Sequence, residues 1–403
     1  MTRRLVAATL LALATCWTVV GSSAASTIGT GARTATTCLS VAFTPDRVWD
    51  VASTRLAALA APATTFPFGT TGDGAYLRTS AYSWTSGFYP ASLWLMYGKT
   101  RDPRWLARAR SFTDRLLPVA TWTGTHDLGF MIGVPMRLGA ALDPSGNRQQ
   151  RYREAIISAA DSLAKRWNRQ VGAVKSGDYG GKWGLIIDSA MNAPLLIEAA
   201  RSVDSKHGKS LERKGLQHMK TLAANLVRSD GSTIHRMAFN AKTGQPLGPL
   251  FGQGLSEAST WARGQAWAIH GFTDAYTFTH DPGMLDAALN TANYWIEQVP
   301  AGCVPAWDLD VDSPTAPRDT SAAAIAADAL VNLGKADPDP DRGAQYSAYG
   351  SATRAALTAP RWVPDGAGRG VLRGQSYNIP AVAREGSYVW GDFYLLESLA
   401  ETG

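Results

Sequence analysis

Apolar and charged stretches alternate along nearly the whole chain, each with the spacing of a helix. Six stretches mix charged with apolar residues, as half-exposed helices do: 45–60, 103–117, 148–167, 210–227, 282–299 and 344–359. Six others alternate with them, poor in charge and rich in Ala, Gly and aromatic residues: 86–98, 127–142, 187–200, 261–276, 319–334 and 388–399. The pattern predicts six outer and six inner helices.

Such alternation is what a ring of helical hairpins requires, because an inner helix touches neighbours on every side whereas an outer helix faces water. An internal repeat supports the ring: residues 98–117 and 277–296 share an Asp-Pro helix start, then Leu and Ala at equal offsets. The expected fold is an all-α (α/α)6 barrel, with an irregular helical solenoid as the alternative. Two turn signals flank alternating residues in 230–254, which predicts a small β-hairpin in a long loop.

The first 25 residues have the pattern of a secretory signal peptide. Two arginines precede an apolar segment, and small residues follow it at the expected cleavage region. A lipoprotein form acylated at Cys16 is a weaker alternative, because Thr15 is a poor residue just before the acceptor. We expect an amino-terminal arm at 26–40 and one catalytic domain at 41–403, in a secreted or cell-surface protein.

Composition narrows the classes of ligand. The formal net charge is +6, and removal of the two arginines with the signal peptide would leave +4, without any basic run. This suits a modestly anionic ligand and argues against nucleic acid, and no membrane association is expected after signal removal. No metal-binding spacing is present, so no cofactor or metal is expected. Cys38 and Cys303 could form one disulfide after export or remain two thiols.

Three aspartates stand at the predicted starts of inner helices, and these starts gather at one end of such a barrel. Asp127 precedes the apolar run LGFMIGVPM, and Asp188 follows Leu-Ile-Ile, an apolar lead-in that would strip water from the acid. Asp319 precedes Thr-Ser and a run of alanines. Each could also be an ordinary helix cap, and for Asp319 that is the favoured interpretation.

Six motifs occur in the order known from one enzyme family: 84–94 (WTSGFYPASLW), 126–130 (HDLGF), 186–196 (IIDSAMNAPLL), 261–267 (WARGQAW), 319–330 (DTSAAAIAADAL) and 388–399 (YVWGDFYLLESL). Together they resemble the unsaturated glucuronyl hydrolases of glycoside hydrolase family 88. The resemblance implies an (α/α)6 barrel that removes a 4,5-unsaturated uronic acid from the non-reducing end of oligosaccharides made by polysaccharide lyases. It also implies that Asp127 and Asp188 are the catalytic pair.

The chemistry of this reaction explains the need for two carboxyl groups. The C4=C5 bond of the substrate is a vinyl ether, so its hydration needs a proton at C4 and an activated water at C5. Asp188 can supply both as general acid and then base if it begins protonated. Its apolar neighbours and the like charge of Asp127 are expected to raise its pKa against the effect of the helix start. Asp127 would position Asp188 and stabilise the cationic transition state.

Other residues are implied as substrate contacts by their place in the family motifs. Arg263 is expected to bind the uronate carboxylate, the alternative being an internal salt bridge with Glu257. His126 is expected to neighbour Asp127 rather than act as a catalyst. Sugar stacking or polar contact is expected of five further residues, each of which could instead be structural: Trp84, Trp261, Trp267, His235 and Gln253.

Some positions depart from the family pattern and leave the leaving sugar undecided. Gly177 stands where an aromatic residue is expected, Trp183 lies nearer the helix, and Glu257 replaces an aspartate. The alternatives are an unsaturated rhamnogalacturonyl hydrolase acting on pectin fragments, a polysaccharide lyase or sugar epimerase on the same barrel, and a non-catalytic carbohydrate-binding relic. The parent polysaccharide and the oligomeric state are not determined at this level.

Overall fold

The structure of the protein is a computed structural model of the 403-residue chain. It describes residues 37–38, 42–60, 62, 64–70, 74–203, 205–366, 368, 370–379 and 385–400. Residues 32–403 belong to one compact unit. The predicted signal peptide, with the alternative acceptor Cys16, lies outside the described residues. Among the described helices, none combines the length and the apolar character that crossing a membrane would need.

Six helices of the described part are the outer ones. Each has a buried face and a charged, exposed one, as the mixed pattern predicts: α1 (Pro45–Ala58), α3 (Pro103–Asp114), α5 (Gly146–Ala164), α8 (Lys206–Leu226), α10 (Pro282–Gln298) and α12 (Pro340–Leu357). The Asp-Pro repeat marks two of their starts. Asp102 accepts a hydrogen bond from the Arg104 N–H, and Asp281 accepts one from the Gly283 N–H, so both aspartates cap their helices.

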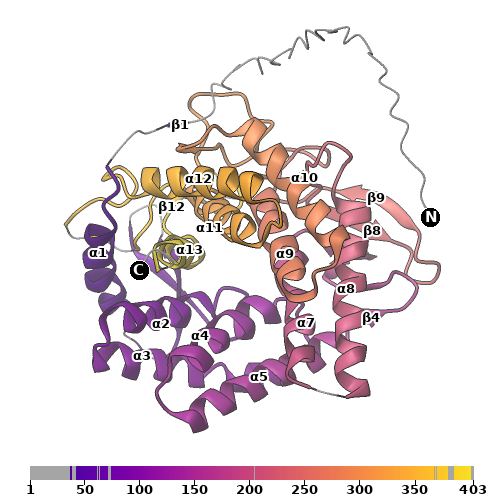
Figure 1. Ribbon diagram of the computed structural model, residues 1–403, viewed down its shortest axis with the longest axis horizontal. Coiled ribbons are helices and arrows are strands. Elements are labelled where there is room, and N and C mark those ends of the chain that lie inside the picture. The colour runs from indigo at the N-terminus through magenta and orange to yellow at the C-terminus, as the bar shows by residue number, and fades with distance from the viewer. Residues whose placement is uncertain are drawn as a thin grey trace, which may run out of the picture. The chain divides into compact units, whose positions relative to one another are not determined.

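The inner helices alternate with the outer ones, and all of them except α4 are buried almost all round. They are α2 (Phe88–Thr100), α4 (Val134–Leu142), α6 (Ser189–Asn192) with α7 (Pro194–Arg201), α9 (Ala262–Thr279), α11 (Thr320–Ala336) and α13 (Val389–Ala400). A π-helical turn, Gly129–Gly133, precedes α4. Helix α13 packs against both α11 and α2, which closes the ring (Figure 1). The (α/α)6 barrel is confirmed, and the solenoid alternative is wrong.

Two glycines allow other helical segments to approach the short helix α6 closely. A Cβ atom on Gly129 would lie 2.6 Å from the Cα of Asn192, and one on Gly271 would overlap the carbonyl oxygen of Ala190. Both contacts bring other helices against α6, the short helix that begins just after Asp188. The backbone around Asp188 is therefore clamped from two sides.

The predicted hairpin exists and belongs to a larger sheet. Strands β8 (Arg236–Phe239) and β9 (Pro246–Leu250) pair as expected, and β8 also pairs with β7 (Lys182–Ile186), which pairs with β6 (Gly177–Tyr179). All four strands are antiparallel neighbours. Among the other described strands, three two-stranded pairs are β2 (Phe66–Thr70) with β3 (Tyr76–Thr79), β4 (Trp167–Asn168) with β5 (Ala173–Val174), and β11 (Gln375–Ser376) with β12 (Glu385–Gly386).

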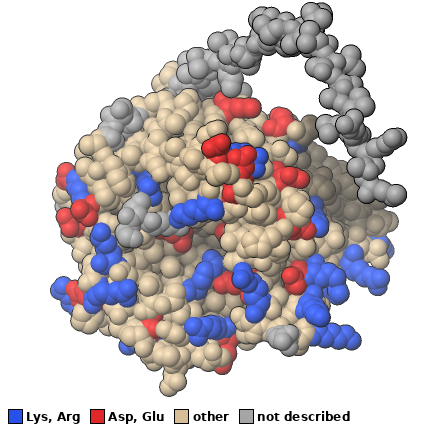
Figure 2. Space-filling view, in the orientation of Figure 1, with Lys and Arg blue, Asp and Glu red and all other residues tan. Residues whose placement is uncertain are grey.

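The two cysteines left open by the sequence form a disulfide. Cys38 in β1 (Thr37–Cys38) is bonded to Cys303 in β10 (Cys303–Val304), 265 residues away, and the two strands pair directly. The bond ties the amino-terminal arm to a late loop. On the face shown in Figure 2, positive and negative side chains are interspersed rather than segregated.

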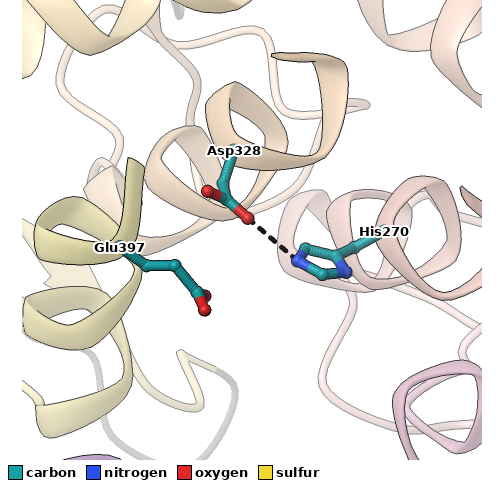
Figure 3. Close-up of side chains that lie close together, drawn as sticks. All are labelled: His270, Asp328 and Glu397. Carbon is teal, nitrogen blue, oxygen red and sulfur yellow. Dashed lines mark hydrogen bonds and ion pairs between the residues drawn. The ribbon is translucent and has the colours of Figure 1, made fainter. Parts of the chain in front are cut away.

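A polar cluster lies in the interior of the barrel, beyond the first turns of the inner helices. His270 on α9 lies between two carboxylates, with Nδ1 3.3 Å from Asp274 Oδ2 and Nε2 3.0 Å from Asp328 Oδ2. Figure 3 shows Glu397 of α13 pointing toward the same point, and one ligand atom each from His270, Asp328 and Glu397 lies within 4.8 Å of the others. Burial alone would lower the pKa of His270, but Asp274 and Asp328 raise that pKa well above its usual value. Both aspartates thus favour the protonated form of His270.

Candidate active site

A pocket of about 150 Å³ opens at the starts of the inner helices. It brings together six residues predicted from the sequence and two that were not, Ile186 and Tyr377. The full lining is Trp84, Asp127, Ile186, Asp188, Gln253, Trp261, Arg263 and Tyr377. Segments far apart in the sequence therefore converge here, as a barrel with its site at one end requires.

Asp188 lies in the pocket at the end of β7 and the start of α6. Its residue is buried, yet its side chain makes no capping hydrogen bond to the helix that it precedes. Oδ2 is shielded from solvent without a hydrogen-bond partner among the described residues, and it faces Nε2 of His235 at 3.6 Å. The interpretation of Asp188 as a helix cap is therefore wrong, and its carboxylate is available for chemistry.

His235 contacts Asp188 in a defined tautomer. The Gln253 backbone N–H donates to Nδ1 of His235 at 2.7 Å, so Nδ1 is an acceptor and the proton of a neutral ring lies on Nε2, toward Asp188. Burial lowers the pKa of His235, and the opposing effect of Asp188 does not restore it. A neutral imidazole therefore presents an N–H to the carboxylate. His235 lies beside Asp188 rather than on the pocket wall where a sugar contact was predicted.

The ionisation of Asp188 differs from the expectation. Burial raises the pKa of Asp188, but the facing N–H of His235 and the positive charge of Arg263 help to bring that pKa below its usual value. Asp127 is not among the dominant influences. Burial raises this pKa as expected, but the predicted net rise is wrong for the protein alone, because the sequence did not show which donors surround the acid.

Asp127 is held by three side chains in front of the π-helical turn. Oδ2 accepts a hydrogen bond from Thr125 Oγ1 at 2.9 Å, while Oδ1 lies 3.3 Å from His126 Nε2 and 3.4 Å from Asn192 Nδ2. None of these partners is a backbone N–H of the following helix, so this carboxylate does not act as a cap. The arrangement fixes Asp127 while leaving it on the pocket wall.

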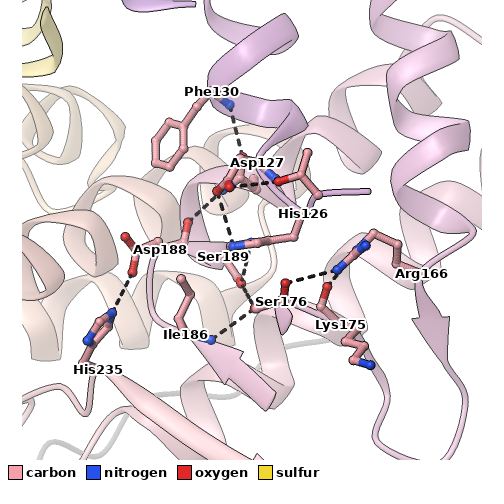
Figure 4. A network of polar contacts seen from close by, with 12 residues as sticks. His126, Asp127, Phe130, Arg166, Lys175, Ser176, Ile186, Asp188, Ser189 and His235 are labelled. Atoms are coloured by element: carbon pink, nitrogen blue, oxygen red, sulfur yellow. Dashed lines mark hydrogen bonds and ion pairs between the residues drawn. The ribbon is translucent and has the colours of Figure 1, made fainter. Parts of the chain in front are cut away.

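A chain of hydrogen bonds orients His126 from behind. The Ile186 N–H donates to Ser176 Oγ at 3.1 Å, Ser176 Oγ and Ser189 Oγ are 2.7 Å apart, and Ser189 Oγ lies 3.3 Å from His126 Nδ1. If the chain runs in one direction, Nδ1 accepts and Nε2–H points to Asp127. Figure 4 shows this network beside the Asp188–His235 contact. The contact confirms the prediction that His126 is a neighbour of Asp127.

Asn192 joins the two aspartates and was not predicted. Its Nδ2 lies within hydrogen-bond distance of both Asp127 Oδ1 and the Asp188 carbonyl oxygen, at 3.4 and 3.2 Å, and its Oδ1 accepts from the Phe130 N–H at 3.1 Å. A helical offset of four from Asp188 within IIDSAMNAPLL was the signal that could have identified it. One amide thus fixes the two carboxylate-bearing segments relative to each other.

Arg263 lines the pocket, but its charge is already paired. Nη1 lies 2.7 Å from Asp319 Oδ2 and also donates to the Ser376 carbonyl, while Nη2 donates to Tyr377 O at 2.5 Å and Gln253 Oε1 at 3.2 Å. Of the two predicted alternatives, an internal salt bridge is present, with Asp319 rather than Glu257. Asp319 also accepts hydrogen bonds from two helix N–H groups of α11, which confirms it as a cap.

The three tryptophans of the prediction fall into two groups. Trp84 and Trp261 line the pocket, and the guanidinium carbon of Arg263 lies 4.4 Å from the Trp261 ring centroid. Trp267 is fully buried, does not line the pocket, and packs 5.0 Å from the Phe130 ring, centroid to centroid. The prediction that Trp267 contacts a sugar is wrong, because its position on α9 directs it into the barrel core.

Comparison with known proteins adds a second kind of evidence. No family model matches the chain. An unsaturated glucuronyl hydrolase of Formosa agariphila is 35% identical over 263 residues, 64% of each chain, so the match spans just under two thirds of that relative. An unsaturated chondroitin disaccharide hydrolase of Streptococcus pneumoniae is 32% identical over 351 residues, 83% of this chain and 85% of the relative.

Solved structures give the same result at the level of the fold. A heparin-specific unsaturated glucuronyl hydrolase superposes with a TM-score of 0.81 at 28% identity, covering 88% of this chain and 95% of that one. A variant of the Streptococcus agalactiae enzyme in complex with dGlcA-GalNAc6S superposes with a TM-score of 0.74 at 27% identity, covering 90% and 93%. The barrel, the paired aspartates at the helix starts and the relatives of nearly full length agree: the chain belongs to the unsaturated glucuronyl hydrolases, a family of glycoside hydrolases.

Proposed function

We propose that this protein releases a 4,5-unsaturated uronic acid from the non-reducing end of lyase-generated oligosaccharides by hydrating the C4=C5 bond. The observation that carries the proposal is Asp188, a buried and uncapped carboxylate on the pocket wall that faces the N–H of a neutral His235. Asp127 lies on the same wall and is joined to the Asp188 segment through Asn192. These are the parts that a general acid/base reaction needs.

The reaction is balanced around one carboxyl group. Asp188 delivers a proton to C4 and then takes one from the water that adds its oxygen to C5. The resulting hemiketal opens by breaking the C5–O5 bond, which leaves a ketone at C5 and a hemiacetal at C1. This hemiacetal collapses to an aldehyde and releases the next sugar as an alcohol, without nucleophilic attack on the anomeric carbon. The Asp188 carboxylate ends as it began, protonated, because the proton taken from water replaces the one given to C4.

Substrate binding favours the protonated form of Asp188, which is disfavoured in the protein alone. A uronate carboxylate in a pocket of this size places a negative charge near Asp188 and excludes water, and both effects raise the pKa of a carboxyl group. His235 then stabilises the anion that forms when the proton leaves, and Asp127 stabilises positive charge developing at C5. The same surroundings that lower the pKa of Asp188 thus help it to donate its proton to C4.

Binding groups surround this pair. Trp84 and Trp261 present flat aromatic faces on the pocket wall, which suit a sugar ring. Arg263 donates to Gln253 Oε1 and thereby leaves the amide nitrogen of Gln253 as the donor for substrate. The negative charge of Asp319 reduces the positive potential that Arg263 adds to the pocket. We therefore propose that Arg263 mainly holds the pocket in shape and attracts the uronate only as a secondary role.

We further propose that the substrates are unsaturated disaccharides of the glycosaminoglycan type, met outside the cytoplasm. The names of the relatives support this class over rhamnogalacturonyl substrates, over lyase or epimerase activity and over a non-catalytic relic. The signal-like residues 1–25 support export, and so does the Cys38–Cys303 disulfide, since such bonds persist in oxidising compartments.

The test is a panel of lyase-made unsaturated disaccharides from chondroitin, hyaluronan, heparin, gellan and pectin. Hydration removes the conjugated double bond, so turnover is followed as loss of ultraviolet absorbance. Saturated glucuronides of the same sugars are the control, and they should remain intact because they have no vinyl ether. Cleavage of the saturated controls at a comparable rate, or no turnover of any unsaturated member, would refute the proposed function.

A further inference from the structure

A second and larger pocket, of about 460 Å³, lies on the four-stranded sheet that carries His235 and Ile186 at its edge. Its lining residues adjoin those of the first pocket along the chain: Arg236 follows His235, and Phe251 lies two residues before Gln253. Its lining includes Tyr179, Lys182, Arg236, Phe251 and Glu257.

The strand register places both pockets on one face of the sheet. Tyr179 is paired with Lys182, Ile186 with Arg236, and Arg236 with Leu250. Residues directly opposite each other in an antiparallel pair share a face, and every second residue along a strand does too. Ile186 lines the pocket of the aspartates, whereas the other four line the larger one. The sheet face therefore connects the pocket of the aspartates, where the unsaturated sugar would react, with the larger pocket, where the next sugar would lie.

Two glycines in the middle of this face leave room for one aromatic ring. Gly177 and Gly184 are paired, and a Cβ on Gly177 would lie 3.1 Å from Cζ of Tyr179 while one on Gly184 would overlap the same ring. The Tyr179 side chain therefore lies across the bare strand. The guanidinium carbon of Arg236 lies 4.4 Å from its ring centroid. Tyr179 thus supports Arg236 from the sheet side.

Arg236 is held in place without being neutralised. Its Nη1 donates to the Phe251 carbonyl at 3.2 Å, and no carboxylate within the described residues forms an ion pair with it. Lys182 is a second cation on the same face. Of the two acids in the lining, Asp178 is paired with Lys175 at 2.6 Å, which leaves Glu257 as the opposing charge. The pocket therefore has an excess of positive charge around a positioned guanidinium.

We propose that this pocket holds the leaving sugar and that Arg236, positioned by Tyr179, selects leaving sugars that carry an anionic substituent, a sulfate ester or a carboxylate. The inference rests on the proposed function and adds the substrate class to it. It assigns specificity to the sheet face, whereas the proton transfer remains with the aspartates.

The first test compares turnover of an unsaturated chondroitin disaccharide sulfated at O6 of the hexosamine with its unsulfated parent. Arg236→Gln should lower the ratio of kcat/KM values, sulfated over unsulfated, by about tenfold, in line with the loss of one charge-assisted hydrogen bond. Tyr179→Leu should lower the ratio in the same direction, because it releases the guanidinium. Lys242→Gln, at an exposed position in the β8–β9 turn, removes an equal charge outside the pocket and is the matched control.

A binding measurement separates this proposal from the proposed function. N-acetylgalactosamine 6-sulfate, N-acetylgalactosamine and glucuronic acid are titrated into the wild-type protein and Arg236→Gln and followed by ligand-observed NMR. The sulfated sugar or the uronic acid should bind more tightly than the neutral sugar in the wild type only, and the two anions distinguish sulfate from carboxylate. An unchanged turnover ratio in folded Arg236→Gln overturns the specificity proposal alone. If no unsaturated sugar is turned over, the proposed function fails, and equal binding of neutral and anionic sugars then overturns this proposal as well.

Discussion

Nε2 of His235 lies 3.6 Å from Oδ2 of Asp188, and the opposite nitrogen of the same ring accepts a hydrogen bond from the Gln253 backbone. The histidine is therefore oriented by the loop after β9 and directs its N–H at the acid after β7. This contact lowers the pKa of Asp188 against the effect of burial.

Asp188→Asn should abolish most of the activity without unfolding the protein. Asparagine keeps the size of the side chain but cannot give or take the proton, so kcat should fall by about 10² to 10⁴, the range for a lost general acid or base. The folded state should persist, because no capping hydrogen bond is lost. Thermal unfolding and turnover measured on one preparation provide the check, and turnover at the wild-type rate would remove Asp188 from the reaction.

Substitutions of the two neighbours of Asp188 should move the alkaline limb of the kcat/KM profile in opposite directions. His235→Leu removes a group that lowers the pKa of Asp188, so the protonated acid should persist to higher pH. Asp127→Asn removes a nearby negative charge, so the limb should move to lower pH and kcat should fall as well. Shifts of the same sign in both variants would exclude Asp188 as the titrating group.

Arg263→Met should cost stability rather than only substrate affinity. It leaves Asp319 buried without its cationic partner, and breaking a buried ion pair in this way typically costs about 3 to 5 kcal/mol. The double variant Arg263→Met/Asp319→Asn should recover part of the loss, whereas Glu257→Gln, at an exposed position, should leave unfolding unchanged. Denaturant unfolding decides the matter; a raised KM with unaltered stability would restore Arg263 to direct uronate binding.

His270 should make the stability of the barrel dependent on pH. Because Asp274 and Asp328 raise its folded-state pKa above the unfolded value, its contribution is fully present below the unfolded pKa, about 6.5. That contribution should be lost as pH rises through the folded-state pKa. His270→Gln should be less stable than the wild type at pH 6, and the difference should shrink at alkaline pH. A difference that does not vary with pH would show that His270 is neutral in the fold.

Reduction of the Cys38–Cys303 bond should lower the melting temperature. The closed loop of about 265 residues corresponds to roughly 5 kcal/mol in the chain-entropy model, an upper value because strain and residual structure in the unfolded chain reduce it. Cys303→Ala should show the same loss as chemical reduction, and reduction should have no further effect on that variant. Two free thiols in the purified protein, detected by mass measurement without reductant, would contradict the bond.

Much of the architecture follows from local features of the sequence. Burial on one side or on all sides leaves a periodic signature within each segment, and Asp-Pro marks a helix start by its own backbone chemistry, so twelve alternating helices and the caps at Asp102 and Asp281 were predictable. Asp127 and Asp188 were placed at the mouth of the barrel for the same reason, since helix starts gather at one end. The β8–β9 hairpin was predictable because turn signals flank alternating residues there.

The tertiary structure determined the electrostatic and hydrogen-bonding contacts between residues that are distant in the sequence. The pairing of β7 with β8 brings His235 to Asp188. This contact helps to lower the pKa of Asp188, which burial alone would have raised. Nothing in the sequence near Asp188 predicts that His235 is its neighbour. Arg263 pairs with Asp319 rather than Glu257 because the starts of two adjacent inner helices lie side by side, 56 residues apart in the chain. Periodicity is a property of a segment, whereas charge and hydrogen bonding depend on distance, and only the folded chain sets those distances.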